Sequence, residues 1–246
     1  MHNVSIRSHI VERVLARRGR IHWFERLEPR RSALLVIDMQ ATFCQPGGPA
    51  EVPLSRAIVP GINWLTKALR ELDVPVVWVL HGNRVRNGVS DWEAFFDHVV
   101  AAPEMRRRTQ ESLAADRQQV WPELEVAPQD LKVVKNRYSA FAHGASPLER
   151  MLRERGVDTV LIAGTKTNVC CDSTGRDAMM RDLNAVLVSD CCAALSDEEH
   201  LAALETFIQQ FGDVMTSDEV VARLKGRPAA AEGAAAGASS ASSPSR

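Results

Sequence analysis

Residues 33–38 read Ala-Leu-Leu-Val-Ile-Asp, an unbroken apolar run that stops at a carboxylate. A strand that is apolar at every position is typical of a parallel sheet covered on both faces, because neither face meets water. Similar runs recur along the chain and predict further strands at 74–80, 131–134, 157–163, 185–189 and 213–216. The run at 33–38 is therefore predicted to be the first strand of a buried parallel sheet.

Helical segments separate these predicted strands, at 56–72, 147–155, 168–183 and 197–211. The second of them has Pro147 at its first position and Gly156 after its end, which suits the start and the end of a helix. Strands that alternate with helices, joined by right-handed crossovers, place helices on both faces of the sheet. We therefore predict an α/β fold in a single domain, a three-layer α-β-α sandwich with a mostly parallel, Rossmann-like sheet.

The alternation divides the chain into an N-terminal helical extension (1–29), an α/β domain (30–222) and a tail (223–246). The extension predicts a helix over 4–20. The tail is mostly Ala, Gly and Ser, and we expect it to be disordered because it can bury little apolar surface. Residues 82–128 interrupt the alternation, and a long insertion between strands is typical of a lid or a pocket wall. The basic run Arg106–Arg108 within it is predicted to be a solvated helix face.

The composition argues against several classes of protein. The 246 residues carry 30 Lys and Arg against 31 Asp and Glu, a formal net charge of −1, whereas nucleic-acid-binding proteins usually show a basic excess. No apolar stretch approaches the roughly 20 residues that cross a membrane, and the first ten residues lack the apolar core of a secretory signal. We therefore expect a cytoplasmic protein with no nucleic-acid partner and no membrane partner.

The cysteines indicate a reduced compartment. Four of the five form two adjacent pairs, Cys170-Cys171 and Cys191-Cys192, and no C-x-x-C spacing occurs. Adjacent cysteines make strained bridges, and the missing spacing weakens a zinc-ribbon or thioredoxin interpretation. A reduced protein with at least one working thiol is the better prediction.

Three reactive side chains are predicted to meet at one edge of the sheet. Asp38 ends the first strand, Lys135 ends the third, and Cys170 lies shortly after the fourth. Ligands of open parallel sheets bind beyond the carboxyl ends of the strands, so these side chains converge where a substrate would bind. Cys170 is predicted in the first turn of a helix, where the helix dipole and a nearby lysine favour a thiolate. Asp38 could accept the thiol proton, and free backbone amides could hold an oxyanion.

Three motifs resemble the signatures of isochorismatase-like cysteine hydrolases. They are Leu-Leu-Val-Ile-Asp-Met-Gln at 34–40, Val-Lys-Asn-Arg-Tyr-Ser-Ala-Phe at 134–141, and Gly-Thr-Lys-Thr-Asn-Val-Cys-Cys-Asp-Ser-Thr-Gly-Arg-Asp-Ala at 164–178. The similarity covers roughly residues 30–222, so the α/β domain is interpreted as a hydrolase domain of this kind. It implies a catalytic triad of Asp38 as proton acceptor, Lys135 as electrostatic support and Cys170 as nucleophile. The family spacing G-x-x-T-x-x-C selects Cys170, and Cys171 stands where the family usually has Val.

The resemblance also implies details of the site. It predicts a cis peptide at Lys166–Thr167, and an oxyanion hole made by the backbone amides of Thr167 and Cys170. Nicotinamidases of the family carry an Asp-x-His metal motif after the second strand, whereas residues 80–84 here read Leu-His-Gly-Asn-Arg. We therefore expect no metal and no cofactor. Candidates for the substrate pocket are Trp92, Phe95, Arg137 and Tyr138.

True isochorismatases lack the thiol, so Cys170 favours the branches that hydrolyse small amide, ureido or carbamoyl C–N bonds. The motifs lean toward the ureidoacrylate and N-carbamoyl amidohydrolases. The predicted reaction passes through a thioester at Cys170, and we expect a homo-oligomer, a dimer or a tetramer, that acts on a small molecule.

Several alternatives stay open at this stage. They are an isochorismatase-type hydrolase of a non-amide substrate, a non-catalytic binding domain on the same fold, and a thiol redox protein that uses Cys170 and Cys171. A nucleotide-binding Rossmann enzyme is disfavoured because no G-x-G-x-x-G follows the first strand.

Overall fold

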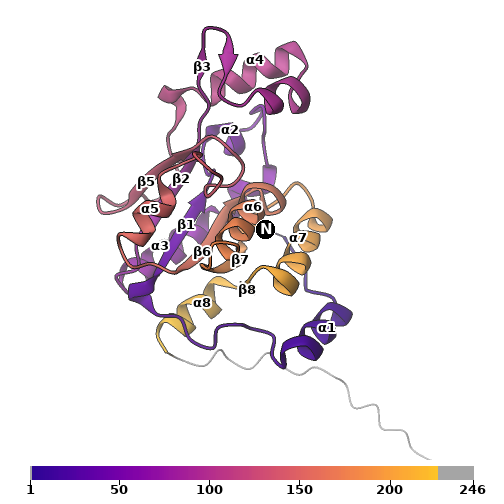
Figure 1. Cartoon of the computed structure of the whole chain (residues 1–246), viewed down its shortest axis with the longest axis vertical. Coiled ribbons are helices and arrows are strands. Elements are labelled where there is room, and N and C mark those ends of the chain that lie inside the picture. Colours follow the sequence, from indigo (N-terminus) through magenta and orange to yellow (C-terminus); the bar gives the residue numbers. More distant parts are fainter. Residues whose placement is uncertain (1, 227–246) are drawn as a thin grey trace, which may run out of the picture.

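The computed structural model describes residues 2–226 and is built around a six-stranded sheet (Figure 1). Its strands are β1 (Ser32–Ile37), β2 (Val76–His81), β5 (Leu131–Lys135), β6 (Thr159–Thr165), β7 (Asn184–Ala193) and β8 (Asp213–Met215). Every pairing between neighbouring strands is parallel. All six predicted strands are present, and the predicted single α/β domain is confirmed.

Helices cover both faces of this sheet because the strands are apolar on both faces. Leu35 of β1 points into one core together with residues of α5 (Leu148–Arg153), α6 (Asp172–Met179) and α7 (Asp197–Gln210). Its neighbour Leu34 points into a second core, formed with α3 (Val59–Arg70) and α8 (Ser217–Leu224). All six residues of β1 are buried. These two cores make the predicted three-layer sandwich.

The order of the strands in space is β5-β2-β1-β6-β7-β8. Counting these six strands along the chain, this is the order 3-2-1-4-5-6 of the Rossmann-like fold, which reverses direction between β1 and β6. Ligands of such sheets bind beyond the carboxyl ends of the strands at this switch point. Gly164 allows the two strands to approach there: its φ is +111°, and a Cβ atom would lie 2.1 Å from the carbonyl oxygen of Ile37.

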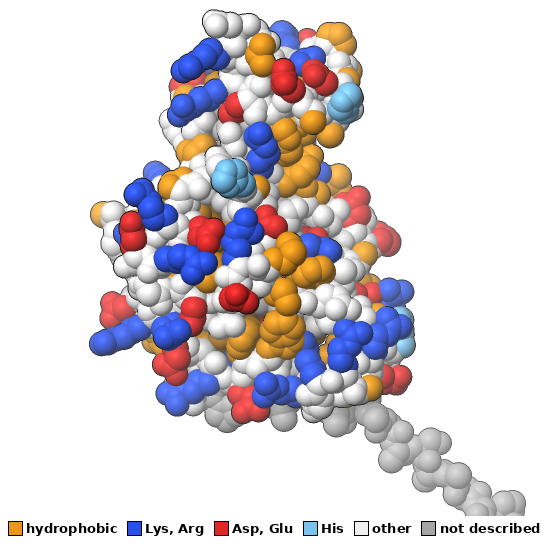
Figure 2. All heavy atoms as spheres, viewed as in Figure 1, with side chains coloured by type: hydrophobic (Ala, Val, Ile, Leu, Met, Phe, Trp, Pro, Cys, Tyr) orange, Lys and Arg blue, Asp and Glu red, His pale blue; other side chains and the backbone are white. Residues whose placement is uncertain are grey.

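The insertion at 82–128 projects from the sheet (top of Figure 1). It contains a hairpin of β3 (Val85–Arg86) and β4 (Val89–Ser90), the π-turn η3 (Phe95–Val99), α4 (Pro103–Ser112) and the short turn η4 (Ala115–Arg117). Arg107 on α4 is exposed and pairs with Glu104 and Glu111 of the same helix, as the prediction of a solvated face requires. In Figure 2, apolar side chains gather where this projecting part joins the body.

The N-terminal extension packs against the body through α1 (Ser8–Arg18). Ile10 and Val14 enter the core that α7 also lines, and Arg7 forms an ion pair with Glu205. The remaining short elements are η1 (Pro29–Arg31), α2 (Ala41–Cys44) and η2 (Pro53–Ile58). None of the helices in residues 2–226 is long and apolar enough to cross a membrane.

The predicted tail begins at 223, yet α8 continues to Leu224, and residues 227–246 lie outside the described residues. α8 itself was not predicted. Its first turn is fixed by a capping box, in which the Thr216 hydroxyl accepts from the Glu219 amide while the Glu219 carboxylate accepts from the Thr216 amide.

Candidate active site

Asp38, Lys135 and Cys170 meet at the switch point of the sheet. Asp38 follows β1, Lys135 ends β5, and Cys170 lies in the π-turn η5 (Thr167–Cys171) after β6. Asp38 and Lys135 are completely buried, and Cys170 is 4% exposed. The Lys135 Nζ donates to Asp38 Oδ2 at 2.9 Å. The other carboxylate oxygen, Asp38 Oδ1, is buried and has no hydrogen-bond partner among the described residues.

The backbone holds Asp38 in an unusual conformation. Its φ is +55°, a left-handed value that few residues other than glycine adopt, and such values cluster at functional sites. Its amide donates to the carbonyl of Val79 on β2 at 2.8 Å. The Gln40 side chain accepts from the amide of His81 and donates to its carbonyl, which ties this turn to the end of β2. The motif at 34–40 therefore fixes the carboxylate between two strand ends.

The ammonium of Lys135 is saturated by three acceptors. They are Asp38 Oδ2 at 2.9 Å, the Arg137 carbonyl at 3.1 Å and His81 Nδ1 at 3.3 Å. Burial acts to lower the pKa of Lys135, but the Asp38 and Cys170 groups outweigh it and raise the pKa. Burial also raises the pKa of Asp38, against the charge of Lys135. The raised pKa of Lys135 favours its charged form, whereas the raised pKa of Asp38 favours its neutral form. The three hydrogen bonds of the ammonium, one of them to Asp38, favour the charged form of both partners.

His81 is a member of the site that the sequence analysis did not single out. It ends β2, is 2% exposed, and its Nε2 lies 3.0 Å from Asn83 Oδ1. Burial and the charge of Lys135 hold the pKa of His81 well below its usual range, so the ring is neutral. Its Nδ1 therefore accepts from Lys135 and its Nε2 donates to Asn83. The sequence held a signal for His81, because a polar residue at the end of an apolar strand also marks Asp38 and Lys135.

Cys170 rests as a thiol. Burial raises its pKa, the charge of Asp38 raises it further, and the opposing charge of Lys135 does not compensate. The sequence analysis expected the helix start and a nearby lysine to favour a thiolate. Lys135 does act to lower the pKa of Cys170, but the desolvation of so deeply buried a sulfur raises the pKa by more. Attack by Cys170 then requires a base that takes its proton.

The carboxylate, imidazole and thiol of Asp38, His81 and Cys170 are all potential metal ligands, and their ligand atoms lie within 4.8 Å of one another. The ammonium of Lys135, however, already contacts both the carboxylate and the imidazole. A metal at this position would have to displace a buried cation and deprotonate the thiol. The residues of the site therefore fit a lysine-centred cluster better than a metal centre.

A cavity of about 450 Å³ opens onto Cys170. Its wall is mostly apolar and includes Phe43, Phe95, Val99, Val100, Leu113, Tyr138, Val169 and Leu195. Of the four pocket candidates, Phe95 and Tyr138 line the cavity, whereas Trp92 and Arg137 do not. Trp92 lies behind them, with ring centroids 4.8 Å from Phe95 and 4.7 Å from Tyr138, and the guanidinium of Arg137 lies 5.3 Å from the Trp92 ring centroid. The insertion thus supplies part of the pocket wall.

The turn that carries Cys170 differs in one respect from expectation. The cis peptide is Thr165–Lys166, one bond before the predicted Lys166–Thr167. β6 continues through Thr165, beyond the predicted end at 163, so the chain leaves the strand at this bond. Lys166 lines the cavity with Cys170, while Thr167 is fully buried. The oxyanion hole made by the amides of Thr167 and Cys170 stays a prediction.

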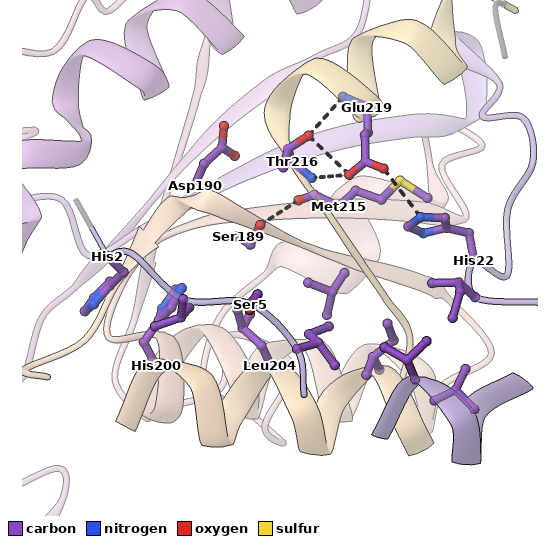
Figure 3. A pocket seen from close by; sticks show the side chains of 17 residues that line it. His2, Ser5, His22, Ser189, Asp190, His200, Leu204, Met215, Thr216 and Glu219 are labelled. Carbon is purple, nitrogen blue, oxygen red and sulfur yellow. Dashed lines mark hydrogen bonds and ion pairs between the residues drawn. The ribbon is translucent and has the colours of Figure 1, made fainter. Parts of the chain in front are cut away.

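The N-terminal extension reaches the base of this turn. A second cavity of about 410 Å³ lies between the extension and the body (Figure 3), and His2 and His200 lie side by side at one end of it. Their rings stack at 4.1 Å, and the His200 Nδ1 lies 2.8 Å from the hydroxyl of Thr167. The His2 Nε2 accepts from the amide of Ala194. Burial lowers the pKa of His200 to about 4, so this ring is neutral as well.

All five cysteines are free, as the prediction of a reduced protein requires. Cys171 is completely buried beside Cys170 without a bridge between them. The structure therefore gives no support to a redox pair at these two positions.

Comparisons with known proteins agree on one family. The family model described as Isochorismatase domain matches residues 32–219. A cysteine hydrolase from Pseudomonas syringae pv. phaseolicola 1448A is 31% identical, with a TM-score of 0.72 over 84% of this chain and 97% of that one. An N-carbamoylsarcosine amidase from Thermoplasma acidophilum is 26% identical, with a TM-score of 0.60 over 77% of this chain and 98% of that one.

Among curated relatives, Enterobactin synthase component B of Escherichia coli (strain K12) is 30% identical over 194 residues, which are 79% of this chain. The match spans 64% of the length of that relative. The family match over most of the chain, the shared fold and the cysteine-hydrolase neighbour lead to one assignment: this chain belongs to the isochorismatase-like cysteine hydrolase family.

Proposed function

We propose that the protein hydrolyses an amide, ureido or carbamoyl C–N bond of a small molecule, through a thioester at Cys170. The observation that carries the proposal is the arrangement at the cavity floor. A thiol faces the cavity, and the carboxylate next to it has one oxygen held by Lys135 and the other buried without a partner. The similarity to an N-carbamoylsarcosine amidase and the motif at 164–178 support the ureido and carbamoyl branch.

The first step forms the bond between Cys170 Sγ and the carbonyl carbon. The thiol proton passes to Asp38, and the carbonyl electron pair moves onto the oxygen, which the backbone amides of the η5 turn hold. A carboxylate whose pKa is raised by burial is a better proton acceptor than an exposed one. Lys135 stays charged throughout and balances the negative charge of Asp38 or of the oxyanion.

The second step breaks the C–N bond. Asp38 returns its proton to the departing nitrogen, which leaves as ammonia or an amine, and the acyl group stays on Cys170 as a thioester. Asp38 then takes a proton from water, the resulting hydroxide attacks the thioester, and the sulfur leaves with that proton. Acid is released and the thiol is restored, so the cycle needs only water as a co-reactant.

The test is ammonia release from a panel of small amides, ureides and N-carbamoyl compounds by the wild type and two matched variants. Cys170→Ala should abolish turnover, whereas Cys171→Ala, which removes the neighbouring buried thiol, should keep most of it. Iodoacetamide should inhibit the wild type in step with alkylation of Cys170. Turnover that survives Cys170→Ala would favour hydrolysis without a thiol, and no turnover of any C–N substrate would favour a non-amide substrate or a binding domain.

A further inference from the structure

Lys166 is a charged side chain in the cavity that the proposed reaction does not use. It follows the last residue of β6, lies four positions before Cys170, and lines the same cavity. It is half-buried, and within residues 2–226 its ammonium forms no hydrogen bond and no ion pair. A half-buried lysine on the wall of a substrate cavity therefore has three unused donors.

The other charges at the cavity have partners of their own. The Glu51 carboxylate accepts from the Gly47 amide at 2.7 Å and from Arg56 Nη1 at 2.9 Å. Asp38 and Lys135 form the buried pair already described, and His81 is neutral. After these pairs cancel, Lys166 leaves the cavity with one uncompensated positive charge.

The mostly apolar wall of the cavity makes the charge of Lys166 important for substrate binding. A substrate that fills the cavity removes water from Lys166, and the apolar side chains around it supply no replacement acceptor. Desolvating an ammonium without a partner is costly, whereas a carboxylate supplies a charge-assisted hydrogen bond in the same place. A neutral substrate of this size would be penalised, and an anionic one would be favoured.

We infer that Lys166 binds a carboxylate of the substrate, so that the protein acts on anionic amides or ureides with an apolar body. The inference rests on the proposed hydrolase function and narrows its substrate class. Lys166 immediately precedes the η5 turn that holds Cys170, and both residues line the same cavity, so one substrate could contact both. The volume of about 450 Å³ and the aromatic wall leave room for an apolar side chain well beyond the size of urea or acetamide.

The experiment separates binding from turnover. N-carbamoyl-leucine and its methyl ester share the carbamoyl group and the apolar side chain, but the ester lacks the carboxylate charge and carries one extra methyl group. Each is titrated by calorimetry into protein carrying Cys170→Ser. The acid should bind about 10- to 100-fold more tightly than the ester, which is what a charged hydrogen bond contributes. Adding Lys166→Met should remove this preference, and Lys166→Arg should keep most of it.

Lys67→Met, which removes an exposed lysine of α3 outside the cavity, is the matched control and should leave both affinities unchanged. Equal binding of acid and ester, a preference that survives Lys166→Met, or failure of both compounds to bind would overturn the inference. Ammonia release by the wild type is scored separately. If the acid binds through Lys166 but no ammonia appears, the proposed hydrolysis fails and the carboxylate site stands. If acid and ester are hydrolysed equally well, the proposed hydrolysis stands and the carboxylate site fails.

Discussion

Asp38 and Lys135 act on the Cys170 thiol with opposite signs. The negative charge of Asp38 raises the pKa of the thiol, and the positive charge of Lys135 lowers it. The buried sulfur stays protonated at rest because desolvation outweighs the lysine. In the proposed mechanism, reactivity at this site thus depends on moving a proton to Asp38 rather than on a thiolate present at rest.

The first prediction follows from these signs. Asp38→Asn should lower the pKa of Cys170 and speed its alkylation by iodoacetamide near pH 8, yet cut turnover by about 10²- to 10⁴-fold because the proton acceptor is lost. Lys135→Met should raise the pKa of Cys170 further and slow alkylation. Labelling rates from pH 6 to pH 10, measured beside hydrolysis, test both signs. Slower alkylation in Asp38→Asn would contradict this prediction. It would show that Asp38 speeds alkylation by accepting the thiol proton more than it slows alkylation by its negative charge.

The buried pair should also show in stability. Lys135→Met leaves the Asp38 carboxylate buried without its cation, which should cost about 3–5 kcal/mol of unfolding free energy. Asp38→Asn combined with Lys135→Met removes both charges and should recover part of that loss. Urea unfolding of the wild type, the two single variants and the double variant gives the coupling. Additive losses would mean that the two charges do not interact in the folded state.

At the scale of single residues, the sequence predicted the groups that bear chemistry but not their environment. Asp38, Lys135 and Cys170 could be found because each lies at or after a strand end within a recognisable motif. The role of His81 depends on the third acceptor that the Lys135 ammonium needs, which is visible only once the strands are side by side. The protonated state of Cys170 depends on its burial, which no local pattern states.

At the scale of elements, strands were predictable and polar or short pieces were not. β7 extends to Ala193, past the predicted end at 189. The prediction stopped early because Ser189 and Asp190 interrupt the apolar run before the buried Cys191 and Cys192. α8 was missed although its capping box was present in the sequence, because its apolar residues are few and close to the tail. The insertion lacks a continuous apolar pattern, since its side chains are divided between the cavity, solvent and one core, which Leu124 enters.

The N-terminal extension is joined to β8 and α8 by ionic contacts. The His22 Nδ1 lies 2.9 Å from Asp213 Oδ1, and its Nε2 lies 3.5 Å from Glu219 Oε1 (Figure 3 shows the second contact). Burial alone would lower the pKa of His22, but the hydrogen bonds to Asp213 and Glu219 raise it to about 9. Burial would raise the pKa of Glu219, but His22 and the Thr216 amide lower it to about 2.

These shifts predict how the attachment depends on pH. The raised pKa of His22 stabilises the fold fully below about pH 6.5, and this contribution is lost as the pH rises through about 9. The lowered pKa of Glu219 stabilises it above about pH 4.5, and that contribution is lost as the pH falls through about 2. His22→Ala should therefore cost about 1 kcal/mol at pH 6 and much less at pH 10.

Urea unfolding at the two pH values measures this difference, with His143→Ala, an exposed histidine elsewhere in the chain, as control. A cost for His22→Ala that is the same at pH 6 and pH 10 would show that the ring acts by packing and not by its charge.

At the scale of the whole molecule, the strand order explains why the site lies where it does. The chain reverses its direction of winding between β1 and β6, and Asp38 and the Cys170 turn follow those two strands. Lys135 reaches them from β5, across β2, with a fully buried side chain. The alternation of strands and helices was sufficient to predict the layers and the edge of the sheet that bears the site. It could not predict the cavity, because the wall comes from segments that are distant in sequence.

The most direct test of the central claim is intact-mass spectrometry of the protein during turnover, quenched in acid within the first cycles. A substrate identified in the ammonia-release panel should add the mass of its acyl group to the protein. Digestion should place the adduct on Cys170 and not on Cys171, and the adduct should vanish when the substrate is exhausted. Steady turnover with no adduct on Cys170, together with activity retained in Cys170→Ala, would contradict the account.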